Sequence, residues 1–124
     1  MELPGRRFGE AVVLSPSGPL DHATADAFQD ALLARLDRCA AGGDRVVLDL
    51  AGVDYIASVG LRVLMLAARK VKAQGGTLVL AAMQPVVKEI FDISRFAAIL
   101  EAFPTVREAL AKVAPGALAA FDLA

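Results

Sequence analysis

Few side chains in this sequence could carry out covalent chemistry, and those few are widely separated. The only histidine, His22, follows Asp21 at the expected start of a helix, where a solvated or capping role is ordinary. Ser58 is followed two residues later by Gly60 but preceded two residues earlier by Ile56, so only half of a hydrolase Gly-X-Ser-X-Gly elbow is present. A hydrolase acting through Ser58 would have to recruit His22 from a distant loop as its base. This is the least supported of the functions considered.

Metal and phosphate chemistry are not expected either. One histidine, one cysteine (Cys39) and scattered acids do not form a converging set of ligands. The pairs Gly42-Gly43 and Gly75-Gly76 lack the Lys-Ser/Thr and the spacing of a phosphate-binding loop, and each stands where a helix should end. We therefore expect no metal, no cofactor and no enzymatic activity.

Length, composition and charge limit the classes of protein to which this chain can belong. The chain has 124 residues, is 56% hydrophobic and has a formal net charge of -1, as expected for one compact domain over residues 1–124. Neither sign of charge forms a block that would follow a nucleic-acid backbone. Apolar stretches such as 61–68 contain Arg62 and are shorter than the roughly 18 to 20 residues of a membrane span. Arg6 and Arg7 are not followed by the apolar region of an export signal, and the lone Cys39 suits a reducing compartment, so we expect a cytoplasmic protein without membrane insertion.

Hydrophobic periodicity predicts alternating strands and helices. Short apolar runs predict strands at 11–14, 46–50 and 77–81 and a last short one around 99–100, with 15–19 as a loop and 52–57 as a connection. Helical spacing predicts helices from Asp21 to Gly42, from Ser58 to Gly75, from Pro85 and from Pro104. Because parallel neighbouring strands need crossover helices, this order predicts an α/β sandwich with a mostly parallel central sheet of about four to five strands and about four helices. The core would cover about residues 11–113, followed by an apolar tail at 114–124.

The region 46–76 carries a more specific pattern. An apolar strand, Val46-Val47-Leu48-Asp49-Leu50, is followed by Tyr55-Ile56-Ala57-Ser58-Val59-Gly60-Leu61 at a helix start. Gly18-Pro19-Leu20-Asp21 precedes the first helix, and Gly75-Gly76-Thr77-Leu78-Val79-Leu80, the helix at 85–91 and Ala109-Leu110 follow in order. These motifs resemble the STAS family, whose founding members are bacterial anti-sigma factor antagonists, and the resemblance covers about residues 11–113.

The resemblance implies a regulatory binding module that works by partner switching. An unphosphorylated antagonist binds an anti-sigma factor that is also a GHKL-type serine kinase, which frees a sigma factor, and a serine phosphatase reverses the phosphorylation. The family's phosphoacceptor matches Ser58 here. The residues implied to bind the partner are Asp21, Ile56, Ala57, Val59, Gly60, Leu61 and Arg62, and homodimer formation stays open.

Three positions depart from the family pattern. Ala57 replaces the acidic residue that usually precedes the phosphoacceptor, and Val59 replaces a second hydroxyl residue, which leaves Ser58 as the only hydroxyl in this loop. Arg95 stands where the family commonly has Gly after Ser94. A second function also stays open, that of a STAS accessory subunit of a lipid or anion transporter, because the apolar side chains of Leu118, Phe121 and Leu123 could cover a partner surface.

Overall fold

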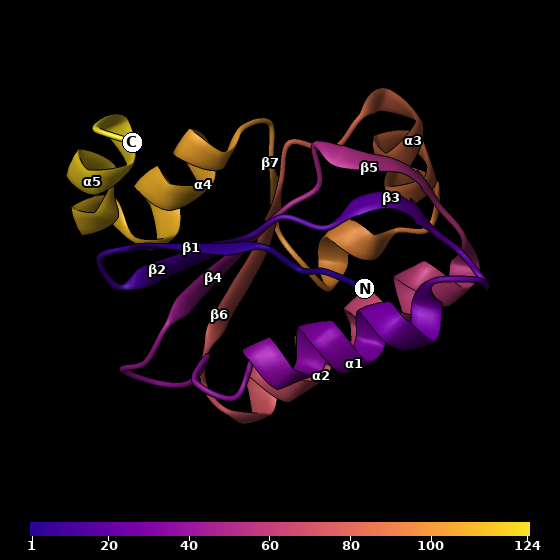
Figure 1. The fold of residues 1–124 in the computed structure, drawn as a ribbon, viewed down its shortest axis with the longest axis horizontal. Coiled ribbons are helices and arrows are strands. Elements are labelled where there is room, and N and C mark those ends of the chain that lie inside the picture. The colour runs from indigo at the N-terminus through magenta and orange to yellow at the C-terminus, as the bar shows by residue number, and fades with distance from the viewer.

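The computed structural model describes all residues, 1–124, and its main layer is a five-stranded sheet (Figure 1). The strands are β1 (Gly5–Phe8), β2 (Ala11–Leu14), β4 (Arg45–Asp49), β6 (Thr77–Ala81) and β7 (Ala102–Phe103), in the spatial order β1-β2-β4-β6-β7. β1 pairs antiparallel with β2, whereas the remaining neighbours are parallel. The mostly parallel sheet predicted from the alternation of elements is confirmed, with β4 at its centre.

Two further strands form a separate parallel pair beside this sheet. β3 (Ser17–Leu20) and β5 (Gly52–Ile56) are in register at Leu20 and Ile56. The predictions of a loop over 15–19 and of a plain connection over 52–57 were therefore wrong. The reason is local composition, since Gly18, Pro19 and Gly52 are turn residues that hide strand periodicity in so short a segment.

Helices cover both faces of the main sheet (Figure 1). On one face, α1 (Ala25–Arg35) and α2 (Ser58–Ala73) bury residues such as Phe28, Leu32 and Leu64 in one hydrophobic cluster with Val46 and Leu48 of β4. On the other face, α4 (Val106–Val113) packs against the alternate strand residues in a second cluster. α3 (Pro85–Ile93) contacts β5. A central parallel strand has two buried faces, and Val46, Val47 and Leu48 in the middle of β4 are accordingly all apolar and buried.

Several element ends differ from the predictions. The first helix spans only Ala25–Arg35, because a turn that begins at Asp21 precedes it and irregular turns follow it. The last strand lies at Ala102–Phe103, and α4 begins after Thr105, whose side chain accepts a hydrogen bond from the Glu108 N–H at 3.1 Å. The Pro115–Ala117 segment η2 and α5 (Leu118–Asp122) form the predicted tail.

Both ends of the chain pack on the domain. In the tail, Phe121 meets Phe8 of β1 edge-on, with ring centroids 5.3 Å apart. Leu3 and Ala117 are buried as well, so packed residues extend beyond the predicted core of 11–113 on either side. None of the helices combines the length and hydropathy needed to cross a bilayer.

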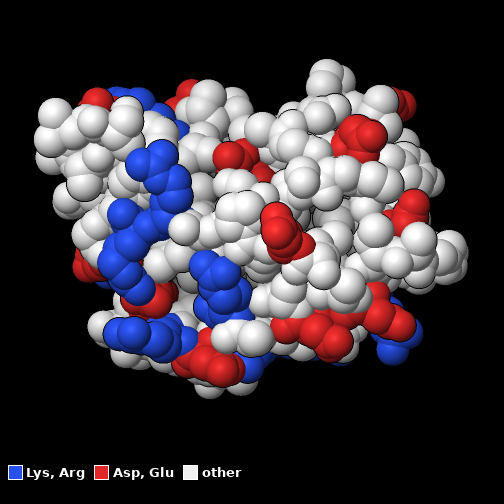
Figure 2. Space-filling view, viewed as in Figure 1, with Lys and Arg blue, Asp and Glu red and all other residues white.

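Charged side chains are unevenly spread over the surface, and basic ones gather over β1 and the neighbouring end of α1 (Figure 2). Arg7 there forms two hydrogen bonds of 3.0 Å with Asp44, and Arg35 donates to the Leu3 carbonyl at 2.9 Å. The hydrogen bond from Arg7 holds the pKa of Asp44 below its ordinary value. Arg7 and Arg35 of this basic region are therefore already bound to groups of the chain itself.

Candidate functional site

Ser58 is the first residue of α2, and only Ala57 separates it from the end of β5. The residue at the N-cap is Ala57, in extended conformation, and it has no side chain that could cap the helix. Ser58 is exposed, and its hydroxyl takes part in none of the side-chain hydrogen bonds of the structure. Its position agrees with the prediction that it lies at or near the N-cap, but the hydroxyl does no capping and is free for other chemistry.

The pairing of β3 with β5 brings Asp21 close to Ser58. Leu20 ends β3 opposite Ile56, and the Ala57 N–H donates to the Leu20 carbonyl at 2.9 Å, so the residues that follow the two strands leave the same end of the pair (Figure 1). The Asp21 carboxylate accepts a 3.0 Å hydrogen bond from the N–H of Ala23 in its own turn. The loop between β3 and α1 and the start of α2 therefore form one contiguous site.

Gly60 lets α2 lie directly against the end of β3. A Cβ at this position would stand 2.8 Å from the Leu20 carbonyl oxygen and 2.9 Å from Cγ1 of Ile56, closer than carbon atoms pack. Gly60 is buried, as are Ile56 and Leu61 on either side of the exposed Ser58. These three residues hold the start of the helix in place.

Burial narrows the predicted partner-binding surface. Of the seven residues named for it, Ile56, Gly60 and Leu61 are buried and cannot offer side chains to a partner in this conformation. Asp21, Ala57 and Val59 are half-buried, and Arg62 is exposed. Sequence reasoning placed all seven together, but it could not tell the positions that face solvent from those that face the core.

The start of α2 itself favours an anion, although the Asp21 carboxylate lies in the same site. The first turn of α2 carries no acidic residue, and the first N–H groups of a helix have no partners within it. Arg62 lies one turn further along the helix, on the same side as Ser58, and is in none of the ion pairs of the structure. A phosphate on Ser58 could therefore be tolerated at this helix start.

An exposed aromatic side chain beside the site was not singled out from the sequence. Tyr55 lies on β5, three residues before Ser58, and 47% of it is exposed. Val53 and Ile56 of the same strand are buried. Strict alternation along β5 would place Tyr55 on the same face as the buried Val53, so a strand prediction alone would not have indicated its exposure. Its aromatic side chain is the signal that the sequence offered, because aromatic residues are enriched where proteins bind one another.

Neither a metal-ligand cluster nor a hydrogen-bonded histidine accompanies Ser58. No three His, Cys, Asp or Glu side chains of the structure are grouped so that they could hold a metal ion. His22 is exposed and shares no hydrogen bond with Ser58. The fold and site thus define a small mixed α/β domain with a free serine hydroxyl at the start of a helix.

Comparison with known proteins places this domain in a family. The STAS domain family matches residues 5–109, and the chain belongs to it. A candidate anti-sigma factor antagonist of Bordetella bronchiseptica, BtrV, is 43% identical over 96 residues, which are 76% of this chain and 78% of BtrV.

Solved structures share the fold at lower identity. An anti-sigma factor antagonist from Mycobacterium paratuberculosis superposes with a TM-score of 0.80 at 24% identity, over 90% of this chain and 92% of that chain. The anti-sigma factor antagonist SpoIIAA of Bacillus matches at 18% identity with TM-scores of 0.69 in its unphosphorylated and 0.63 in its phosphorylated form. These matches cover 90% of this chain and 96% and 99% of the two SpoIIAA chains.

Proposed function

We propose that this chain is an anti-sigma factor antagonist whose partner-binding face surrounds Ser58 and is switched off by phosphorylation of that serine. The observation that carries the proposal is the exposed Ser58 hydroxyl, which no hydrogen bond within the chain engages. Membership of the STAS family and the 43% identity to BtrV, itself a candidate anti-sigma factor antagonist, support it.

The binding face is built from the accessible members of the site. Asp21, Ala57, Val59 and Arg62 surround Ser58, and Tyr55 adds an aromatic side chain at the end of β5. This mixture of small apolar, aromatic and charged groups is suited to contact with another protein. The partner is an anti-sigma factor that is also a GHKL-type serine kinase, and its capture frees a sigma factor in the cytoplasm.

The same partner supplies the switch. The kinase transfers the terminal phosphoryl group of ATP to the Ser58 oxygen, the serine proton passes to a base of the kinase, and ADP leaves. The phosphate adds about -1.5 to -2 charges in the centre of the face, which opposes binding through desolvation and repulsion. Since the hydroxyl supports no contact of the fold, phosphorylation should change binding without unfolding the chain. A serine phosphatase restores the binding state.

Paired baits test the proposal. Wild-type, Ser58→Asp and Ser58→Ala chains are immobilised, exposed to extract of the native cells, and the captured proteins are identified by mass spectrometry. Ser94 is also an exposed serine but lies at the end of α3, so Ser94→Asp is the matched control for added charge. We expect the wild-type, Ser58→Ala and Ser94→Asp baits to capture an anti-sigma factor kinase. The Ser58→Asp bait should not capture it.

Incubation with the captured kinase and ATP should then add one phosphate to the wild-type chain and none to Ser58→Ala. Equal capture of the kinase by all four baits, or a phosphate on Ser58→Ala, would contradict the switch. Equal capture of a transporter subunit without any kinase would favour the accessory-subunit function instead.

A further inference from the structure

One edge of the main sheet is only half covered. β7 pairs with β6 at only two positions, Leu80 with Ala102 and Ala81 with Phe103. The Leu80 N–H donates to the Glu101 carbonyl at 2.9 Å, and the Ala82 N–H donates to the Phe103 carbonyl at 3.0 Å. Even-numbered residues of β6 thus direct their backbone groups towards β7, while the Ala81 carbonyl accepts a hydrogen bond from Leu50 on the other side.

The same alternation applies to Leu78, near the start of β6. Its N–H and carbonyl face the side of β7, because successive residues of a strand direct their backbone groups to opposite sides. The chain before β7 passes this point without pairing, and no backbone hydrogen bond joins Leu78 to Ile99 or Glu101. Leu100 is buried in the hydrophobic cluster under α2, which draws the chain away from the edge. The start of β6 therefore offers a free donor and a free acceptor.

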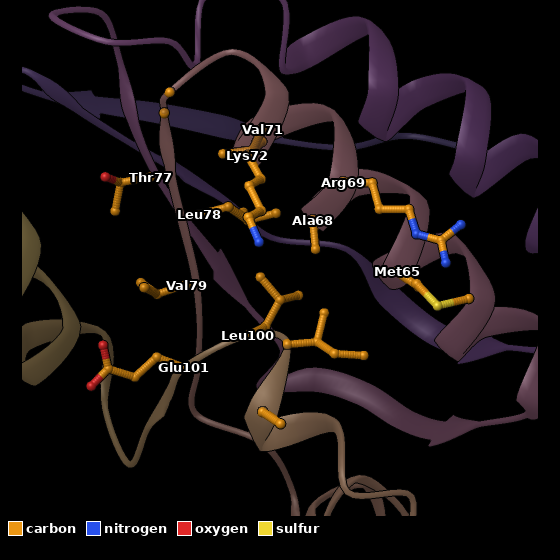
Figure 3. Close-up of a pocket in the computed structure, with 14 residues that line it drawn as sticks. Met65, Ala68, Arg69, Val71, Lys72, Thr77, Leu78, Val79, Leu100 and Glu101 are labelled. Atoms are coloured by element: carbon orange, nitrogen blue, oxygen red, sulfur yellow. The ribbon is translucent and has the colours of Figure 1, made fainter.

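A cavity of about 770 Å³ surrounds this free edge. Its lining comes from both faces of the sheet: Ala68, Lys72 and Leu100 lie on the side of α2, and Thr77 and Val79 point to the opposite side (Figure 3). The space therefore lies along the part of β6 that β7 does not pair with.

The rim of the cavity is positively charged on the side of α2. Arg69 and Lys72 line it, and neither is in any ion pair of the structure, whereas the adjacent Lys70 is paired with Asp37. Lys72 extends over the cavity towards Leu78 and Ala68, while Glu101 points away on the far side of β6 (Figure 3). A peptide segment that lies along this edge would therefore contact the unpaired Lys72 and would have the unpaired Arg69 close by at the rim.

We propose that this edge binds an extended segment of a partner protein, which adds to β6 as a strand. Its backbone would pair with the Leu78 N–H and carbonyl, one apolar side chain would lie between Ala68 and Leu100, and an acidic side chain would face Lys72 and Arg69. Strand addition at open sheet edges is a general mode of peptide recognition, in which backbone hydrogen bonds supply affinity and side-chain pockets supply specificity. The edge is a separate surface from Ser58, so it stands independently of the proposed switch.

Backbone amide exchange and peptide titration test this proposal on the intact chain. The probes are three acetylated seven-residue peptides of alternating Thr and Val that differ only at the central position, which is Asp, Lys or Thr. In the free chain the Leu78 amide should exchange at least tenfold faster than the amides of Val79 and Ala81, which face β4. The Asp peptide should shift the NMR signals of residues 77–79, slow exchange at Leu78 at least tenfold and bind more tightly than the Lys peptide.

Variants separate this site from non-specific binding. Lys72→Glu should lower the affinity for the Asp peptide at least tenfold, so that this peptide no longer binds more tightly than the Lys peptide. Lys112→Glu makes the same charge change on the exposed side of α4 and should leave both affinities unchanged. Ala68→Phe should fill the cavity and block all three peptides. The proposal is overturned by slow exchange at Leu78 in the free chain, by failure of every peptide to shift residues 77–79, or by equal binding to the Lys72→Glu variant. A concentration-dependent dimer that protects Leu78 would likewise overturn it, since a second copy would then occupy the edge.

Discussion

The α-carbon of Gly60 faces the carbonyl oxygen of Leu20 so closely that a Cβ at residue 60 would stand 2.8 Å from that oxygen. This contact joins the start of α2, where Ser58 lies, to the end of β3, after which Asp21 follows. The geometry of the candidate site therefore depends on a residue that has no side chain.

Replacement of Gly60 by alanine should destabilise the chain. The new methyl group would meet backbone and strand atoms that cannot move without shifting β3 or α2, and overpacking of this kind costs about 1 to 3 kcal/mol. The free energy of unfolding from urea denaturation measures the effect. Gly116→Ala is the control, because a Cβ there meets nothing within 4 Å, and it should stay within about 1 kcal/mol of wild type. Equal stability of the two variants would contradict the close contact.

Ser58→Ala should leave stability unchanged, within about 0.5 kcal/mol, because the hydroxyl makes no hydrogen bond within the chain. Thr105 provides the comparison, since its hydroxyl accepts from the Glu108 N–H at 3.1 Å as a true N-cap. Thr105→Ala should cost about 1 kcal/mol. Thermal or urea unfolding of both variants checks this, and a loss at Ser58 as large as that at Thr105 would show that the serine serves the fold.

The pairing of Arg7 with Asp44 should make stability depend on pH in the acid range. The folded chain holds the pKa of Asp44 below its ordinary value of 3.8, chiefly through the Arg7 hydrogen bond. A depressed carboxyl pKa stabilises the folded state at pH values above the unfolded pKa, and this stabilisation is lost as the pH falls through the folded pKa. The stability difference between wild type and Asp44→Asn should therefore be full near neutral pH and shrink below about pH 4.

Urea unfolding of both chains at a series of pH values measures that difference. Arg7→Met removes the donor of the hydrogen bond and should lose the same pH-dependent part of the stability. A difference between wild type and Asp44→Asn that stays constant from neutral to acid pH would contradict the assignment.

Cys39 should react slowly with alkylating reagents in the folded chain. Its side chain is fully buried, its Sγ donates to the Thr77 carbonyl at 3.1 Å, and desolvation raises the pKa of the thiol, so both access and the reactive thiolate are limited. Mass spectrometry of iodoacetamide-treated protein should show little modification without urea and rapid modification above the unfolding midpoint. Rapid labelling of the native chain would indicate that the turn after α1 opens readily.

Local periodicity in the sequence was sufficient for the main architecture. The apolar runs at 46–50 and 77–81 predicted β4 and β6 almost to the residue, and the spacing from Ser58 to Gly75 predicted α2. Those elements pack on the core along most of their length, so burial imposes a pattern that can be read without knowing the neighbours. The same pattern, with the motif around Ser58, was enough to suggest the STAS family and the serine.

Tertiary structure decided which residues of the candidate site are accessible and where the sheet stays open. β3 and β5 are short, contain turn-forming residues and are stabilised by pairing with each other. The sequence pattern of Gly52–Ile56 therefore predicted a connection and not a strand. Ile56, Gly60 and Leu61 lie beside Ser58 in sequence but face the core, and the end of β3 packs against Ile56 and Gly60. The free backbone groups of Leu78 exist because β7 is two residues long and begins too late to cover them. Each of these features depends on contacts between segments far apart in the chain, which local spacing does not encode.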